Sequence, residues 1–141
     1  MSWEIHKFVK FDVVLRIWGE GIVLEEITQE IGVEPTRVRR KGEVRTLTSK
    51  DQVIEKTTSW QISTRERLQS GSITSHIEYL VQSISERKVY TPSLAGVEGA
   101  HIYVGVFRDT APNHNAVEFI IDNSLLGQIA MLGLSVNFIY H

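Results

Sequence analysis

The alternation of apolar and polar residues near the start of the chain limits the fold more than any other feature. Over residues 8–18 apolar side chains occupy every second position, and most positions between them are polar. A two-residue period is typical of a strand that buries one face and exposes the other. Over residues 23–31 the period becomes that of a helix with one apolar side, and Gly32 and Pro35 follow as stop signals. The sequence therefore predicts a strand followed by a helix.

The rest of the chain continues with the same two periods. Residues 36–56 have no sustained period and are expected to be mainly loop. The further elements expected are a strand over 57–64, a helix from Ser72 to Arg87, a strand over 101–107, a strand carrying Val117, Phe119 and Ile121, a helix from Ser124 to Leu132, and a strand over 134–140. This order predicts a single α+β domain over residues 1–141: a sandwich with a mostly antiparallel sheet of about five strands and two or three helices on one face. A ferredoxin-like arrangement, or a related one, is the commonest solution.

Composition narrows the classes of function. The 141 residues carry 15 basic and 17 acidic side chains, so the formal charge of -2 creates no overall field that would attract nucleic acid or a membrane. Because there is no cysteine, a disulfide, a thiol nucleophile and a thiolate metal site are excluded. No apolar run approaches the roughly 18 residues of a membrane span, and the first residues lack the core of a signal peptide. We expect a cytoplasmic protein.

Several segments together are similar to a known family. In chain order they are Asp12-Val-Val-Leu-Arg-Ile17, Glu26-Ile27-Thr28, Ile31-Gly32-Val33-Glu34-Pro35, Lys41-Gly42-Glu43, Trp60-Gln61-Ile62, Leu132-Gly133-Leu134 and Phe138-Ile139-Tyr140. The pattern resembles a family of small bacterial proteins that is catalogued only as a domain of unknown function. This resemblance implies a bacterial, cytoplasmic single domain, and it supplies no catalytic or ligand-binding residues.

Charge is segregated between two neighbouring segments. Residues 20–34 hold five glutamates and no basic residue, whereas residues 37–45 hold five of the fifteen basic residues and one glutamate. The basic residues are Arg37, Arg39, Arg40, Lys41 and Arg45. Arginines beside a glycine, here Gly42, suit phosphate because guanidinium groups match its oxygens, and Trp60 could offer a stacking face. Alternatively, the basic loop folds back on the acidic helix and the charges partly cancel.

No arrangement typical of catalysis or of a cofactor site stands out. The sequence contains neither an HExxH nor a GxSxG motif, and the Gly19-Glu20-Gly21 turn lacks the lysine of a phosphate-binding loop. His101 and His114 flank one expected hairpin with Asp109 in its loop, and they could bind a metal only if the register brought them together. We therefore expect no catalytic residues, no metal and no cofactor.

These observations favour a non-enzymatic binding module. The expected partner is another protein, as for inhibitors, immunity proteins and adaptors, and the expected contact residues are Arg37, Arg39, Arg40, Lys41 and Trp60. The alternative is a nucleic-acid or phosphorylated ligand bound by the basic loop 37–45. A homodimer through an edge strand is a further alternative, because a five-stranded sheet leaves edges to cover. No membrane contact is expected.

Overall fold

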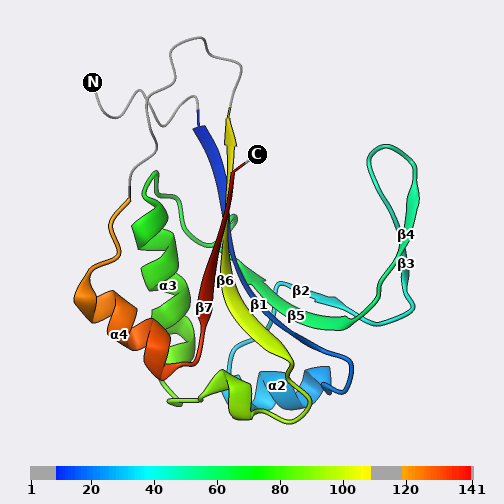
Figure 1. Cartoon of the computed structure of the whole chain (residues 1–141), viewed down its shortest axis with the longest axis horizontal. Helices are drawn as coiled ribbons and strands as arrows, with labels where there is room; N and C mark the ends of the chain where they lie inside the picture. Colours follow the sequence, from blue (N-terminus) through cyan, green and yellow to red (C-terminus); the bar gives the residue numbers. More distant parts are fainter. Residues whose placement is uncertain (1–8, 109–118, 141) are drawn as a thin grey trace.

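A computed structural model describes residues 9–108 and 119–140 of the chain (Figure 1). The elements in chain order are β1 (Val9–Gly19), α2 (Leu24–Ile31), β2 (Arg37–Arg39), β3 (Val44–Thr46), β4 (Gln52–Ile54), β5 (Thr58–Ser63), α3 (Ile73–Ser85), the 3-10 turn η1 (Thr91–Ser93), β6 (Gly99–Arg108), α4 (Asn123–Met131) and β7 (Ser135–Tyr140). The strand and helix predicted over residues 8–31 are β1 and α2. Gly32 ends α2 with a φ of 82°, a left-handed conformation that glycine adopts without strain.

Five strands form one sheet in the order β2-β5-β1-β6-β7. All neighbours are antiparallel except β6 and β7, which run parallel because α4 carries the chain back between them. The predicted α+β class with a mostly antiparallel sheet is confirmed. The parallel strands of the β6-α4-β7 unit are adjacent, whereas in the ferredoxin-like arrangement another strand separates them.

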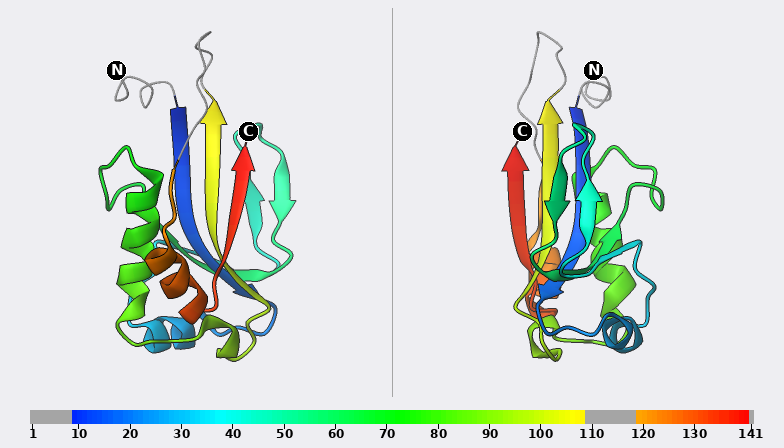
Figure 2. Two further views of the ribbon diagram at one scale, coloured as in Figure 1. Left: turned by 60° about the vertical axis from the view of Figure 1, so that its left-hand side comes forward. Right: turned by 90° about the vertical axis from the view of Figure 1, so that its right-hand side faces the viewer.

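A separate hairpin, β3–β4, projects from the sheet, and we call its residues 44–54 the arm. Figure 1 shows the sheet between α3 and α4 on one side and the arm on the other. In the right-hand view of Figure 2 the arm stands in front of β1 and β6. The arm therefore faces the side of the sheet that the helices leave open.

The structure differs from the predicted strands in two places. Residues 36–56 are mainly loop, as predicted, but they also contain β2, β3 and β4, each only three residues long, too short to show a period. Residues 119–121 are not a strand, and Val117 lies outside the described residues. Phe119 stacks on Phe138 at 5.7 Å between ring centroids, and Thr74 Oγ1 donates to the Ile120 carbonyl at 2.7 Å. This segment therefore packs against α3 and β7, and β2 supplies the fifth strand.

The inner face of the sheet forms the core with the helices. Its buried strand residues are Val13, Leu15 and Ile17 on β1, Trp60 and Ile62 on β5, and Ala100, Ile102, Val104 and Val106 on β6. The buried residues of α2, α3 and α4 belong to the same apolar cluster. Within the described ranges, no helix has the length and apolar character needed to cross a membrane.

The outer face of the sheet carries the alternate residues of the same strands. The register places Arg16 of β1 between Gln61 of β5 and His101 of β6, with Arg37 of β2 beyond Gln61. The next outward residue of β1, Trp18, lies between Ser59 of β5 and Gly99 of β6. The helices of the described ranges lie on the other side of the sheet (Figure 1 and Figure 2), so this face presents its polar side chains on the strands themselves.

Candidate functional site

The basic segment predicted as a binding loop divides between two surfaces. Arg37 and Arg39 lie on β2 and point to the outer face, whereas Val38 between them packs against the core opposite Trp60. Arg40 and Lys41 come after the strand ends. The two-residue period of β2 therefore separates arginines that are close neighbours in the sequence.

Arg40 and Lys41 turn toward the acidic segment. Arg40 Nη2 lies 3.5 Å from Glu25 Oε1 of α2, and Lys41 Nζ lies 3.0 Å from Glu20 Oε1. All four side chains are more than half exposed, and such surface pairs typically contribute about 0–1 kcal/mol. For these two residues the structure agrees with the alternative interpretation, in which basic and acidic charges partly cancel.

Trp60 lies in the core and offers no stacking face. It is completely buried on the inner face, in register with Ile17 and Val38. Its indole Nε1 donates a hydrogen bond to Thr28 Oγ1 of α2 at 2.9 Å, which joins the helix to the sheet. The indole is thus a packing group with a satisfied polar atom, and Trp60 leaves the set of candidate contact residues.

Arg16 occupies the middle of the outer face. Its guanidinium carbon lies 5.7 Å from the ring centroid of Trp18, a cation–π contact. Burial lowers the pKa of Arg16 below its ordinary value, and the charge of Glu55 acts in the opposite direction. An arginine remains charged at neutral pH despite such a shift. The sheet therefore holds a half-buried positive charge at its centre.

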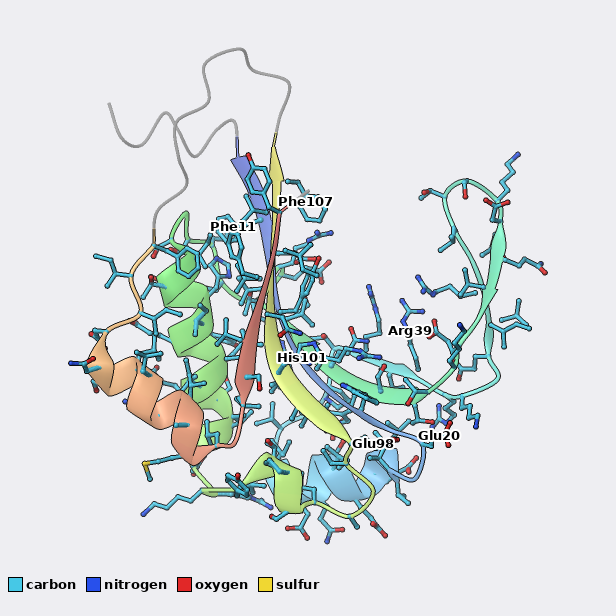
Figure 3. All side chains as sticks on the ribbon, viewed as in Figure 1. Phe11, Glu20, Arg39, Glu98, His101 and Phe107 are labelled. Atoms are coloured by element: carbon cyan, nitrogen blue, oxygen red, sulfur yellow. The ribbon has the colours of Figure 1, made fainter. Side chains whose placement is uncertain are left out.

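Glu55 connects the base of the arm to the sheet. Arg45 of β3 donates its Nε–H to Glu55 Oε1 at 2.8 Å, and Arg39 of β2 donates from Nη1 to the same oxygen at 3.5 Å. The Glu55 side chain is only 14% exposed, so this contact is better shielded than the outer ion pairs. The pKa of Arg39 is lowered by burial first and then by the charges of Arg45 and Arg37, while Glu55 opposes the shift. Figure 3 shows Arg39 on the side of the sheet that faces the arm.

A groove of about 580 Å³ lies beside β2 on the same face. Its lining residues are Asp12, Val14, Thr36, Arg37, Gln61, Ser63, Arg65, Glu66 and Arg67. Arg65 Nη2 lies 3.2 Å from Asp12 Oδ2, so one arginine of the groove is already paired. Arg37 makes no ion pair with any residue that the structure describes.

These contacts define a surface that we call the arginine face. It consists of Arg16, Arg37, Arg39 and Arg45 with Glu55 among them. Four positive charges stand against one carboxylate, and three strands hold them in place. Guanidinium groups bind carboxylates and phosphates through paired hydrogen bonds, so the face is suited to an anionic ligand.

His101 lies next to Arg16 on β6 (Figure 3). Burial lowers the pKa of His101 below its ordinary 6.5, and the positive charge of Arg16 lowers it further. Among residues 9–108 and 119–140, no three histidine, aspartate or glutamate side chains gather as a metal site would need. Asp109 and His114, considered above with His101, lie outside the described residues.

Sequence reasoning found Arg37 and Arg39 and counted Arg45 in the basic loop 37–45, but it missed Arg16 and Glu55 as members of the same surface. The alternation of β1 did place Arg16 on the polar face of a strand. What no local pattern gives is which strands lie beside β1, and the pairing of β1 with β5 and β6 is what surrounds Arg16 with Gln61 and His101.

Comparisons with known proteins bear on family membership alone. Neither the curated proteins nor the solved structures gave a match to this chain. A family model described as "Domain of unknown function (DUF4279)" matches residues 7–141, in agreement with the resemblance noted in the sequence. The chain therefore belongs to this family.

Proposed function

We propose that this protein is a non-enzymatic binding module whose ligand is another protein, as in inhibitors, immunity proteins and adaptors, and that it works in the cytoplasm. The observation that carries the proposal is the arginine face, where Arg16, Arg37, Arg39 and Arg45 face one side of the sheet and Glu55 pairs with Arg39 and Arg45. Complementary charge speeds the encounter of two proteins, and arginine is frequent among the residues that dominate binding energy.

The position of these arginines on strands supports a binding role. A sheet holds side chains in fixed directions, so little conformational entropy remains to be lost when a partner binds. Arg39 is only 20% exposed and Arg45 40% exposed, and both are already oriented by Glu55. The face is therefore a preorganised surface rather than a set of freely moving lysines and arginines.

The surroundings favour a protein over a nucleic acid. The chain has a net charge of -2, and five glutamates of residues 20–34 lie in the segment that meets Arg40 and Lys41. An extended polyphosphate chain would be repelled there, whereas a partner with one acidic patch can meet the arginine face alone. Trp60, the proposed stacking residue, is buried.

The test compares two charge reversals of equal size. One variant carries Arg37→Glu and Arg39→Glu on the arginine face, and the control carries Arg40→Glu and Lys41→Glu outside it. Tagged wild type and both variants are used to capture proteins from a bacterial lysate treated with nuclease, with mass spectrometry as the readout. We expect a stoichiometric protein with wild type and the control but not with the first variant. Equal capture by all three would show that the arginine face is not the contact surface.

A phosphorylated ligand or nucleic acid is the second candidate, and the groove is the observation that favours it. Arg37, Arg65 and Arg67 line the groove together with the hydroxyls of Thr36 and Ser63, groups that suit phosphate oxygens. Omitting nuclease in the same capture distinguishes the two candidates. Captured nucleic acid that is released steeply by salt would favour this second function.

A further inference from the structure

Arg16, like Arg37, makes no ion pair with any acidic residue of the described ranges, and it is the one of the two that lies on the central strand. Arg39 and Arg45 share Glu55, and Arg65 pairs with Asp12. Arg16 makes neither a hydrogen bond nor an ion pair with any residue of the described ranges, and its recorded contact is with Trp18. Its guanidinium nitrogens are not among the buried polar atoms without a partner, so they are open to solvent, and Glu55 acts on Arg16 only through its charge. The N–H groups of Arg16 are therefore available to an anionic ligand.

The groups beside Arg16 suit a planar anion with two oxygens. Gln61 on β5 and His101 on β6 are its direct cross-strand neighbours, so they flank it on both sides. The amide Nε2 of Gln61 donates to Ser59 Oγ at 3.1 Å, and its second N–H is free to donate to a ligand. His101 adds a ring N–H. Together with the guanidinium, they make a row of donors across three strands.

We propose that Arg16 is the anchor for a carboxylate of the protein partner, an aspartate or glutamate side chain that enters between Gln61 and His101. This inference rests on the proposed function and adds the chemical class of the group that is recognised. The N–H groups of the guanidinium fork donate to the two carboxylate oxygens in one plane, and the flanking donors fix the direction of approach.

The arm provides an internal example of the same recognition. Glu55 already binds Arg45 and Arg39 on this face through one carboxylate oxygen. A carboxylate from a partner would repeat that arrangement at Arg16, the arginine of the face that lies nearest the centre of the sheet.

A nucleobase fits the same place less well. The Trp18 indole lies against Gly99, where a Cβ atom would collide with it, and Arg16 approaches the ring as well. Stacking on a base requires an open aromatic face, and Trp18 has contacts on the sheet already. The chemistry around Arg16 therefore favours an acidic peptide over single-stranded nucleic acid.

The probe is a synthetic peptide of ten glutamates, titrated calorimetrically into the wild-type chain and three variants. Arg16→Gln removes the charge, Arg16→Lys keeps the charge but removes the fork, and Arg40→Gln is the matched control on the outer surface. We expect Arg16→Gln to weaken binding about tenfold, equivalent to about 1.4 kcal/mol. Arg16→Lys should lose less, and Arg40→Gln should stay within about twofold of wild type because its pair with Glu25 is exposed.

Nuclear magnetic resonance of the arginine Nε–H groups provides a second readout in the wild-type chain, so the test stands even if a variant fails to fold. The Arg16 signal should shift when the peptide is added. The proposal is overturned if the wild type does not bind the peptide, if Arg16→Gln and Arg40→Gln lose equal affinity, or if a ten-residue thymidine oligonucleotide binds more tightly through Arg16.

Failure of this inference differs from failure of the proposed function. If the lysate partner still binds Arg16→Gln but not the Arg37→Glu, Arg39→Glu variant, the arginine face is the contact surface and Arg16 is not its anchor. If neither variant changes capture, the arginine face is not the contact surface, and both the proposed function and the inference about Arg16 fail.

Discussion

The two faces of β1 carry different kinds of residue on one strand. Val13, Leu15 and Ile17 point inward and are completely buried, while Val14, Arg16 and Trp18 point outward and stay partly accessible. The inward residues belong to the same apolar cluster as the buried helix residues, and the outward ones lie beside residues of β5 and β6. The comparison indicates a division of roles in which the inner face supplies stability and the outer face is available for binding.

The largest expected effect comes from breaking the inner face. Leu15→Ala removes a completely buried side chain from the middle of the core, and we expect the free energy of unfolding to fall by about 3 kcal/mol because a cavity remains. Val14→Ala on the same strand is the control and should cost less than about 1 kcal/mol, since its site is partly exposed. Urea unfolding measures both. Equal losses would contradict the division between the faces.

An intermediate effect is expected at Glu55, which both stabilises the arm and lowers the positive charge of the arginine face. Glu55→Gln should reduce the free energy of unfolding by about 1–2 kcal/mol, because Arg39 and Arg45 lose a shielded charged acceptor. The same change should raise affinity for the ten-glutamate peptide several-fold, because one competing negative charge is removed. Urea unfolding and calorimetry give the two values.

Glu30→Gln, on the exposed side of α2, removes the same charge away from the arginine face and serves as its control. It should change neither stability nor affinity appreciably. A Glu55→Gln variant that loses stability without gaining affinity would show that the arginines reorganise instead of becoming available to a ligand.

The sequence predicted the inner face better than the outer one for a physical reason. Apolar periodicity follows from burial within one element, so the residues of β1 and α2 could be assigned locally. Ser72, the residue with which the second predicted helix begins, is observed capping α3 by accepting from the Ser75 amide at 3.2 Å. These assignments need no knowledge of the neighbouring strands.

The candidate site depends on strand order and on very short strands. Arg16 and Arg37 are far apart in the printed sequence and share one row of the sheet, with Gln61 between them, because β5 pairs with both β1 and β2. Trp60 was placed wrongly for a related reason. Its neighbours in the sequence are polar, yet its indole points into the core, where Nε1 donates a hydrogen bond to Thr28 Oγ1. Which face of a short strand is buried depends on the helix beside it, and α2 decides this for β5.

The smallest expected effect is on the pH dependence of stability, and it concerns His101 on the outer face of the sheet. Because burial and then Arg16 lower the pKa of His101 below 6.5, the folded chain binds the proton less readily than the unfolded chain. The contribution of His101 to stability is therefore complete above pH 6.5 and declines as the pH falls below that value. His101→Gln should remove this part of the pH dependence, so that wild type loses slightly more stability than the variant between neutral and mildly acidic pH.

Ligand binding should act on His101 in the opposite direction. A carboxylate at Arg16 offsets the charge that lowers the pKa of His101, so that pKa should rise when the ten-glutamate peptide binds, and binding should take up a proton. Affinity should then increase about two- to threefold as the pH falls through the titration of His101, and this increase should be absent in His101→Gln. Magnetic resonance titration of the imidazole with and without peptide measures the pKa directly. If the pKa of His101 does not change on binding, the anion does not lie beside His101. The site would then consist of Arg16 on β1 and its neighbours on β5.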